Sequence, residues 1–417
     1  MKTNLKALKK IMKELKRKLK AFFTKKGIDK PIFISALVLA CFGIIMIGSA
    51  SIGAVSMEDN MYAIKNMVTQ SIYATCGLFL MMALTKVFQT RMINYRSSMI
   101  MFIIGILLMC VCVFWTTKGS HAWIHIGRFT VQPAEFMKVS MILILGYMFT
   151  ETDSAYVVKG KFRTAEIKEK FYKDKLLKCV GIPVALILIA FSVGVLVQKD
   201  LGTSIILAVI CFTCFMSTPR DYYKKYKKIV WVIISIALII IFLLISVVLQ
   251  GYQLARIDSW LRPLENIYKS SWQLVNSLIA FSGGGLFGRG LGNSIQKFDY
   301  IPEAHNDFIG AIIYEELGIF GLALIIIPTS IIIFRLLKYA DMIEDNKSRV
   351  ILIGISTYFL LHLFINLGGV SGLIPMTGVP ILLISSGGSS TVAAFISIGI
   401  AQAIISKYNK HLLDTNA

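Results

Sequence analysis

The sequence predicts an all-α, polytopic integral membrane protein with about ten transmembrane helices. Of the 417 residues, 56% are apolar, and the mean hydropathy is +0.71. The apolar residues gather in runs of about 20, the length that one helix needs to cross a hydrocarbon core of roughly 30 Å. These runs are apolar on every side, whereas the strands of a membrane β-barrel would alternate apolar and polar residues. The composition and its pattern therefore indicate a helical membrane protein.

Ten apolar runs are bounded by charged or glycine-rich breaks, and we expect one membrane span in each. The predicted spans lie near residues 32–54, 67–85, 98–116, 131–150, 179–197, 201–217, 229–249, 307–334, 350–367 and 387–406. No tandem repeat and no shift of composition marks a second domain. We therefore expect a basic tail at 1–31, a single ten-helix membrane domain at 32–406 and a short tail at 407–417.

The basic residues predict the orientation of the chain in the membrane. A net charge of +21 would suggest nucleic-acid binding in a soluble protein, but here 34 of the 44 Lys and Arg lie in the tails and in alternate connections. The positive-inside rule then makes both termini cytoplasmic. The connections 117–130, 250–306 and 368–386 fall on the outer face, with 250–306 as a large extracellular loop between the seventh and eighth spans. We expect a multi-pass protein of the plasma membrane with no nucleic-acid partner.

The amino-terminal tail allows two interpretations. Apolar residues from Leu5 to Phe22 recur at three- and four-residue spacing with lysines on the opposite side, which is typical of a basic amphipathic helix on an anionic inner leaflet. The alternative is a solvated tail that only enforces topology. Cysteine and nucleotide motifs add little, because the seven cysteines lie in or beside predicted spans and no nucleotide-binding signature is present.

A lone carboxylate, Asp307, stands where a long glycine-rich loop meets the eighth predicted span. An acidic residue at a membrane mouth is costly to keep, so a functional role is its default interpretation. The alternative is that Asp307 caps the eighth helix. Glu315 and Glu316 follow, and at 1.5 Å per residue Glu315 would lie about 12 Å deeper on the same helix, where both are candidates for interior hydrogen bonding.

Other polar residues gather in the connections expected on the outer face. Glu135 and Lys138, three residues apart, either pair structurally or line a polar cavity. Trp123 is either an interfacial anchor or a ligand. Asp200 is expected to cap a helix.

In the long loop, residues 270–285 predict a short helix along the membrane surface. The glycines that follow allow tight turns and close approach to a bulky ligand, although a plain re-entrant connection would also suit them.

Four segments, in order along the chain, resemble the signatures of the SEDS family (shape, elongation, division and sporulation). They read AWIHIGRFTVQPAEFMK, QKDLGT, QKFDYIPEAHNDFIGAIIYEELG and NLGGVSGLIPMTGVPILLISSGGSS. The resemblance covers nearly the whole chain after the basic tail. The Ser-x-Gln-Lys pattern with PEAH is more similar to the FtsW and SpoVE branches than to RodA. The chain departs from the family pattern at Ala122, Lys199, Asn306, Gly310 and Ser386, where the family usually has Arg, Pro, Thr, Phe and Tyr.

The resemblance implies a peptidoglycan glycosyltransferase that polymerises lipid II at the outer face of the plasma membrane. It also implies a class B penicillin-binding protein as the crosslinking partner, among other cell-division or elongation proteins. By motif position, Asp307 matches the family's essential aspartate. The candidate substrate-binding residues are Trp123, Arg128, Glu135, Lys138, Arg256, Lys297, Glu303, His305, Ser385 and Ser389.

The chemistry of glycan extension suits these residues. A sugar hydroxyl is a weak nucleophile, so a positioned base such as Asp307 helps its attack. The departing pyrophosphate needs positive charge, for which Lys138, Arg256 and Arg128 are candidates, together with a divalent cation such as Mg²⁺ or Mn²⁺ bound through Asp307 or Glu303. A single essential carboxylate suits direct, inverting displacement, whereas a double displacement would need a second carboxylate such as Glu303.

Two rival functions remain open at this stage. In a lipid II transporter, charges within the membrane would line a path across the bilayer. The polar residues, however, gather at the outer mouth, and no inverted repeat with paired broken helices is visible. A non-catalytic scaffold for the penicillin-binding protein would have no requirement for Asp307.

Overall fold

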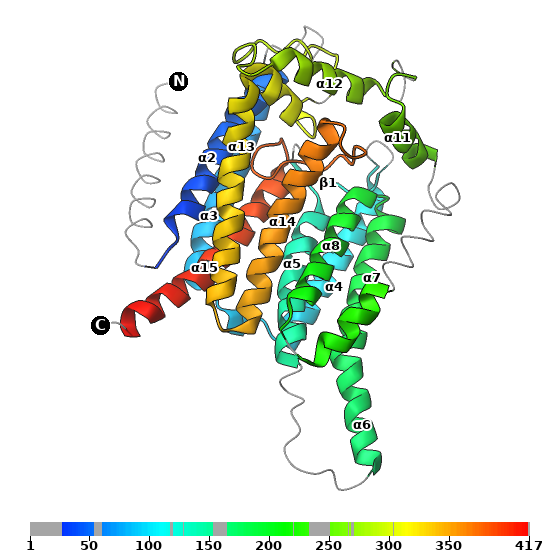
Figure 1. The fold of residues 1–417 in the computed structure, drawn as a ribbon, viewed down its shortest axis with the longest axis vertical. Coiled ribbons are helices and arrows are strands. Elements are labelled where there is room, and N and C mark those ends of the chain that lie inside the picture. The colour runs from blue at the N-terminus through cyan, green and yellow to red at the C-terminus, as the bar shows by residue number, and fades with distance from the viewer. Residues whose placement is uncertain are drawn as a thin grey trace.

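The computed structural model describes residues 27–53, 61–116, 120–127, 129–152, 165–219, 221–232, 251–265, 267, 271–302 and 304–415. In this part of the chain, long helices form a bundle that is covered at one end by short helices and loops (Figure 1). Eight of the described helices are long and apolar enough to cross a membrane, and α8 (Leu201–Ser217) is a shorter apolar helix. The predicted class of polytopic helical membrane protein is confirmed. The seventh predicted span, near 229–249, lies almost entirely outside the described residues.

The long helices follow the predicted spans in order. They are α2 (Lys30–Ser51), α3 (Tyr62–Val87), α4 (Tyr95–Val111), α5 (Pro133–Tyr147), α7 (Ile182–Ser192), α13 (Ile309–Met342), α14 (Asn346–Val370) and α15 (Gly388–Thr415), where α7 is part of a longer helical span, Glu166–Val197. A charged helix, α6 (Ala165–Leu176), continues into α7 through a π-helical turn at Leu177–Gly181. Further π-helical turns end α5 at Met148–Thr152 and α7 at Val193–Val197, and short 3-10 turns lie at Thr90–Met92, Cys112–Phe114 and Asp221–Tyr223.

Polar side chains begin several of these helices by satisfying free backbone N–H groups. Asp29 accepts a bond from the backbone N–H of Ile32 at 3.0 Å, and Asn94 forms a reciprocal capping box with Ser97. Asp200 accepts a bond from the N–H of Thr203 at 3.1 Å, so the predicted capping role of Asp200 is confirmed.

Helices that are far apart in sequence pack side by side in the bundle. In the described part of the chain, α2 packs against α13, and α3 packs against α15. Helix α5 lies among α4, α8 and α14. Glycine permits close approach at such contacts: a methyl group added to Gly399 of α15 would lie 2.9 Å from the backbone of Met81 in α3. The core therefore combines helices that are neighbours in sequence, such as α13 and α14, with pairs that are far apart along the chain.

We name the end of the bundle that carries Ser51 and Val370 the site end. Here a β-hairpin joins β1 (Ile124–Ile126) to β2 (Phe129–Val131), with Ile124 paired to Val131. Only a loop was predicted at this place, so the hairpin is an addition to the prediction. Two short helices, α11 (Gly251–Leu261) and α12 (Trp272–Gly284), also lie at the site end.

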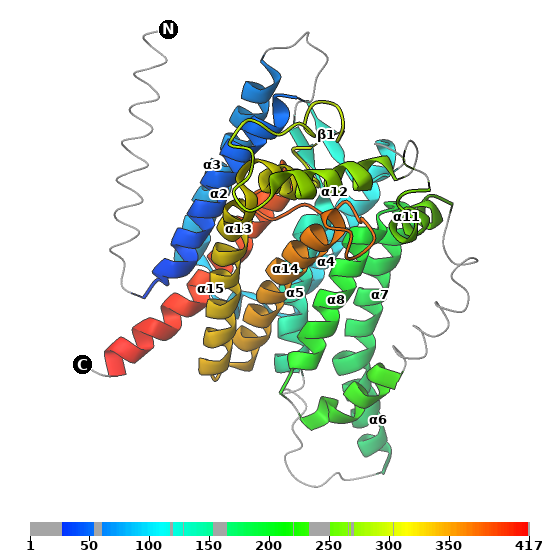
Figure 2. The same cartoon turned by 45° about the horizontal axis from the view of Figure 1, so that its top comes forward.

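Helix α12 lies across the end of the bundle, as Figure 2 shows, and its position confirms the predicted short helix at 270–285. The hydroxyl of Ser277 donates to the carbonyl of Val370 at 2.6 Å, which joins α12 to the end of α14. In the same way, the indole N–H of Trp260 in α11 donates to the carbonyl of Gly372 at 2.8 Å.

Helix α13 consists of two helices that meet at Gly318. The backbone of Gly318 has φ +60° and ψ −143°, which is outside the helical region and suits only glycine. Residues 309–317 therefore form a short helix, and residues 319–342 form the long one. Glu315 and Glu316 lie in the last turn of the short helix 309–317, whose first residue follows Asp307 by two positions, so the kink at Gly318 comes after both glutamates and the predicted depth of Glu315 below Asp307 stays a prediction.

Candidate functional site

Asp307 is half-buried at the site end, two residues before α13 begins. The residue that caps α13 is Phe308, and it makes no side-chain capping bond, so the alternative of Asp307 as the helix cap is not supported. The carbonyl of Asp307 accepts a bond from the side-chain amide of Asn366 in α14 at 2.7 Å. The same amide donates to the carbonyl of Val379 at 2.7 Å, so Asn366 ties the two segments together.

The segment after α14 lies directly beside the carboxylate of Asp307. A methyl group added to Gly378 would lie 3.4 Å from Oδ2 of Asp307, and Gly378 has a φ of +72° that disfavours other residues. The backbone N–H of Ser386 donates to the carbonyl of His305 at 2.9 Å. Asp307 is thus held between its own loop and the 378–386 segment by contacts on both sides.

Three of the predicted substrate-binding residues support this arrangement. His305 is buried, and its ring meets the ring of Tyr62 edge-on at 6.0 Å between centroids. Ser385 is buried, and its hydroxyl accepts a bond from the N–H of Ile381 at 2.9 Å. The hydroxyl of Ser389 accepts a bond from the N–H of Gln132 at 2.8 Å, which joins the start of α15 to the start of α5.

The other signature segments reach the same end of the bundle. The side-chain amide of Gln132 donates to Asp200 at 3.0 Å, which links the start of α5 to the start of α8. A methyl group added to Gly202 would lie 2.9 Å from the carbonyl of Thr377, next to Gly378. Trp123 lies half-buried just before β1. Four segments that are distant in sequence are therefore brought together.

Glu135 and Lys138 form a buried ion pair with a nitrogen–oxygen distance of 2.8 Å. The hydroxyl of Tyr358 donates to the second oxygen of Glu135 at 2.9 Å, and the Lys138 ammonium lies 2.9 Å from Nε2 of His362. Both members of the pair are fully buried. The alternative of structural pairing is therefore supported over cavity lining, and their role in binding substrate stays a prediction.

His362 connects this cluster to the neighbourhood of Asp307. Its Nδ1 lies 2.9 Å from the carbonyl of Pro380, two residues after Gly378. Sequence reasoning missed both His362 and Asn366 as site residues. Each is a polar side chain in a predicted span or at its end, and an ionisable residue within a span is a functional candidate by default, so that signal was available for His362.

The remaining predicted cations differ in their environment. Arg256 is exposed on α11, and its guanidinium donates to the carbonyl of Met376 at 3.1 Å, two residues from Gly378. Lys297 is fully buried and pairs with Glu316 at 2.9 Å. The predictions for Arg128 and Glu303 lie outside the described residues. Within the described ranges, no group of three or more His, Cys, Asp or Glu could hold a metal ion, so a divalent cation stays a prediction.

Comparison with known proteins shows similarity along almost the entire chain. The chain is 35% identical over 387 residues to "Probable peptidoglycan glycosyltransferase FtsW" of Bacillus subtilis, covering 91% of this chain and 90% of that protein. It is 31% identical over 388 residues to "Stage V sporulation protein E" of Bacillus subtilis, covering 92% and 98%.

Two solved structures share the fold. One, described as "Structural coordination of polymerization and crosslinking by a peptidoglycan synthase complex", matches with a TM-score of 0.68 at 19% identity, covering 92% of this chain and 98% of the other. Rod shape determining protein RodA of Thermus thermophilus matches with a TM-score of 0.59 at 19% identity, covering 91% and 96%.

The family match agrees with the motifs and with the fold. Residues 29–411 match the family of cell cycle proteins that comprises FtsW, RodA and SpoVE. The match includes every described segment that surrounds Asp307. Together with the eight helices of the described residues that are able to cross a membrane, it identifies a multi-pass protein of the plasma membrane. The chain belongs to the FtsW/RodA/SpoVE family of cell cycle proteins.

Proposed function

We propose that this protein is a peptidoglycan glycosyltransferase that polymerises lipid II at the outer face of the plasma membrane, in cell division or cell-shape maintenance. Family membership and similarity to proteins named as FtsW glycosyltransferases support this activity. The observation that carries the proposal is the placement of Asp307, a half-buried carboxylate held between two signature segments by Asn366 and by the backbone at Gly378.

In the proposed reaction, a hydroxyl of one disaccharide attacks the anomeric carbon of another. A new glycosidic bond forms, and the bond from that carbon to the lipid pyrophosphate breaks. Asp307 accepts the proton of the attacking hydroxyl as the general base, a contribution of about 10² to 10⁴ in rate. Fixing its backbone between α14 and the 378–386 segment limits its movement before the reaction.

The leaving pyrophosphate requires positive charge or backbone donors near it. We propose Arg256 for this role, because it is exposed and its guanidinium contacts the carbonyl of Met376, close to Gly378 and Asp307. Arg128 is a second candidate. Lys138 and Lys297 are buried in ion pairs, so we propose that they do not contact the substrate and instead hold the backbone segments around the site in place. A single positioned carboxylate favours one direct displacement with inversion.

We further propose that a class B penicillin-binding protein crosslinks the strands beside this site. Its single transmembrane helix would pack near α13 and α14, and its outer domain would touch the 250–306 segment. Both helices carry exposed apolar side chains, among them Phe320 and Phe334 on α13 and Phe364 on α14. A solved synthase complex of the same fold supports a two-protein arrangement.

The test is polymerisation of purified lipid II by the purified chain. The assay is run without the partner, with it, and with a partner whose crosslinking site is inactive. We expect polymer from the wild-type chain whenever the partner protein is present. Asp307→Asn should reduce polymerisation at least about 10²-fold, the lower bound of a general-base contribution. The matched control is Asp341→Asn, which changes an exposed carboxylate at the opposite end of the same helix and should leave the rate unchanged.

A transporter or a scaffold gives different outcomes in the same assay. Neither would produce polymer in any mixture. If a contaminating polymerase were present, the amount of polymer would be the same with the wild-type chain and with the Asp307→Asn variant. Near-normal polymer from a folded Asp307→Asn variant would remove this residue from the mechanism. Each of these results would overturn the assignment.

A further inference from the structure

A segment of the glycine-rich loop is docked on the short helix that follows Asp307. We name residues 286–297 the strap. The backbone N–H groups of Arg289 and Gly290 donate to the carbonyls of Glu315 and Glu316 at 2.9 and 2.8 Å. The strap therefore bonds to the last turn of the helix 309–317, at the end opposite Asp307.

Two glycines permit this docking. A methyl group added to Gly288 would lie 2.2 Å from the carbonyl oxygen of Glu316, and one added to Gly318 would lie 2.2 Å from that of Leu286. Both glycines have positive φ angles, +77° and +60°. The N–H of Ile319 completes the contact by donating to Leu286 at 3.0 Å. Backbone meets backbone here at a distance that no side chain would allow.

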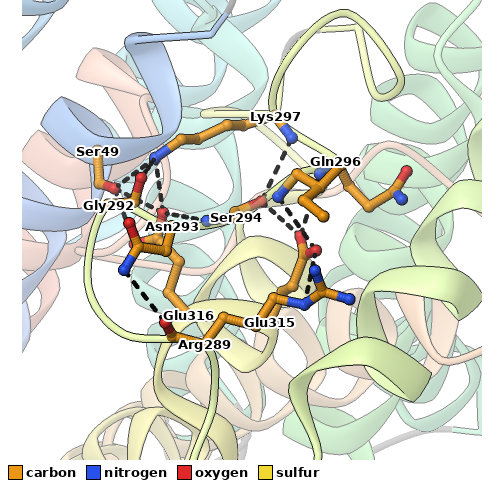
Figure 3. Close-up of polar contacts among 10 residues, drawn as sticks. Ser49, Arg289, Gly292, Asn293, Ser294, Gln296, Lys297, Glu315 and Glu316 are labelled. Atoms are coloured by element: carbon orange, nitrogen blue, oxygen red, sulfur yellow. Dashed lines mark hydrogen bonds and ion pairs between the residues drawn. The ribbon is translucent and has the colours of Figure 1, made fainter.

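The carboxylate of Glu316 joins the strap and the helix to a third element. Its oxygens accept the hydroxyl of Ser49, near the end of α2, at 2.7 Å and the ammonium of Lys297 at 2.9 Å (Figure 3). Lys297 also donates to the carbonyl of Gly292 at 2.6 Å, so it holds its own strap in a closed turn. Both charged side chains are fully buried.

Glu315 holds the strap from the other side. Its carboxylate accepts the backbone N–H groups of Ile295 and Gln296 at 3.1 and 3.2 Å, and it also accepts the hydroxyl of Ser294 (Figure 3). Arg289 approaches it at 3.6 Å. Consecutive glutamates thus face different parts of one strap, and both make the interior hydrogen bonds expected from their place in the sequence.

Stability alone does not explain this arrangement. Burying each of two charges is energetically costly, and a buried pair is often no more stabilising than apolar residues of the same size. The pair of Lys297 and Glu316 instead defines the position of the helix 309–317. It fixes the last turn of this helix against α2, while Asn366 holds Asp307 beside the first turn. Residues 309–317 form one unbroken helix of about 13 Å at 1.5 Å per residue, so we expect it to move as a rigid element that carries a shift at Glu316 to Asp307.

We propose that Lys297 and Glu316 are positioning residues, which set the location of Asp307 by clamping the helix 309–317 to the strap and to the end of α2. Neither residue touches substrate in this proposal, because both are buried. The proposal rests on the proposed function for its kinetic consequence, but its structural consequence can be measured independently.

The kinetic test compares Lys297→Met, Glu316→Gln and the double variant. Each single change leaves one buried charge unpaired and should lower the melting temperature. The double variant should regain stability, yet its kcat for lipid II polymerisation should stay about 10- to 100-fold below wild type with KM unchanged, because a misplacement of about 1 Å has such an effect. A double variant with wild-type kcat would overturn the proposal.

The matched control is Lys347→Met. Lys347 is also buried and paired, with Glu151 at 2.6 Å, but it lies at the end of the bundle opposite Asp307. This variant should lose stability while keeping kcat per folded molecule. An equal fall of kcat in this control would show that any buried lysine has the effect, and the positioning role would be withdrawn.

The second test does not depend on activity. A cysteine at Asn306, which is half-buried beside Asp307, is labelled with a membrane-impermeant thiol reagent, and the chain without this cysteine gives the background. The labelling rate should change several-fold when the double variant of 297 and 316 is introduced, and it should stay constant with Lys347→Met. An unchanged rate in the folded double variant would overturn the positioning role even if the wild-type chain polymerises lipid II. Absence of polymerisation with a changed labelling rate would overturn only the proposed function.

Discussion

Lys199 adopts a left-handed backbone with φ +53° at the turn that leads into α8. A proline ring fixes φ near −65°, so the proline that the family usually has at this position is incompatible with the turn seen here. The side chain of Lys199 is exposed, and its neighbour Asp200 caps the helix. The turn beside the site therefore depends on a residue other than proline at position 199, and the cap at Asp200 follows it directly.

We predict opposite effects for two changes at this residue. Lys199→Gly should raise the free energy of unfolding by roughly 1 kcal/mol, because a side chain in the left-handed region costs about that much. Lys199→Pro should lower it, because the ring forbids the observed φ. Thermal unfolding in detergent measures both. As a control, Lys173→Gly in the regular helix α6 should be destabilising by roughly 0.5–1 kcal/mol. A stabilising proline would show that the turn is not as described.

Residues whose role depends on near neighbours in sequence were predictable. The cap at Asp200 and the pair of Glu135 and Lys138 follow from spacings of three residues, and Asp307 was identified by its motif. The bond from Asn366 to Asp307 joins positions 59 apart, and no local spacing encodes such a contact. The support of Asp307 therefore needed the structure.

At the scale of the element, α13 contains a break at Gly318 that the apolar pattern of its sequence does not reveal. The apolar run continues through Gly318, so the sequence was interpreted as one helix, although a glycine inside such a run lowers confidence in continuity. In the structure the break is required by tertiary contact, because the strap passes within van der Waals distance of Gly318. The β-hairpin at 124–131 was missed for a related reason: strands of three residues are too short to show an alternating pattern.

Gly318→Ala should disrupt the docking of the strap. Alanine would have to adopt a φ of +60°, which strains its backbone, and its methyl group would lie 2.2 Å from the carbonyl oxygen of Leu286. Backbone strain and a steric clash would therefore both destabilise the variant. We expect a loss of at least about 2 kcal/mol in the free energy of unfolding. The measurement is thermal or denaturant unfolding of the purified protein.

The control for this change is Gly181→Ala. Gly181 is helical, and the nearest atom to a new methyl group is the flexible end of Leu177 at 3.2 Å. Its effect should be small or stabilising, since alanine favours helices. Equal destabilisation by both variants would mean that the contact with Leu286 has no special importance.

At the scale of the whole molecule, hydropathy was sufficient for the class of fold. Membrane-spanning helices must satisfy all of their backbone hydrogen bonds internally, so apolar runs of the right length indicate helices directly. Which helices are neighbours was not predictable, because every span is apolar. The packing of α2 on α13 includes a long-range polar contact, from Ser49 to Glu316, that no local pattern encodes.

The orientation in the membrane stays a prediction with a direct measurement. The distribution of basic residues places Lys168 and Lys224 in the cytoplasm and Asn293 outside, and the structure shows all three as exposed. Single cysteines at the two lysine positions should be protected from an impermeant thiol reagent in intact cells, and a cysteine at Asn293 should react. The reverse pattern would place Asp307 on the cytoplasmic side and exclude polymerisation outside the cell.

The pairing of helices that are far apart in sequence also determines when, during synthesis of the chain, the site can form. The first described helix, α2, packs against α13, and α3 packs against α15, the last described helix. Asp307 is held by Asn366 and lies against Gly378, and both are made after it during synthesis. A chain still emerging from the ribosome therefore has its carboxylate in the membrane without the surroundings that position it. The arrangement of the bundle makes the insertion of the last helices the step after which the complete site first exists.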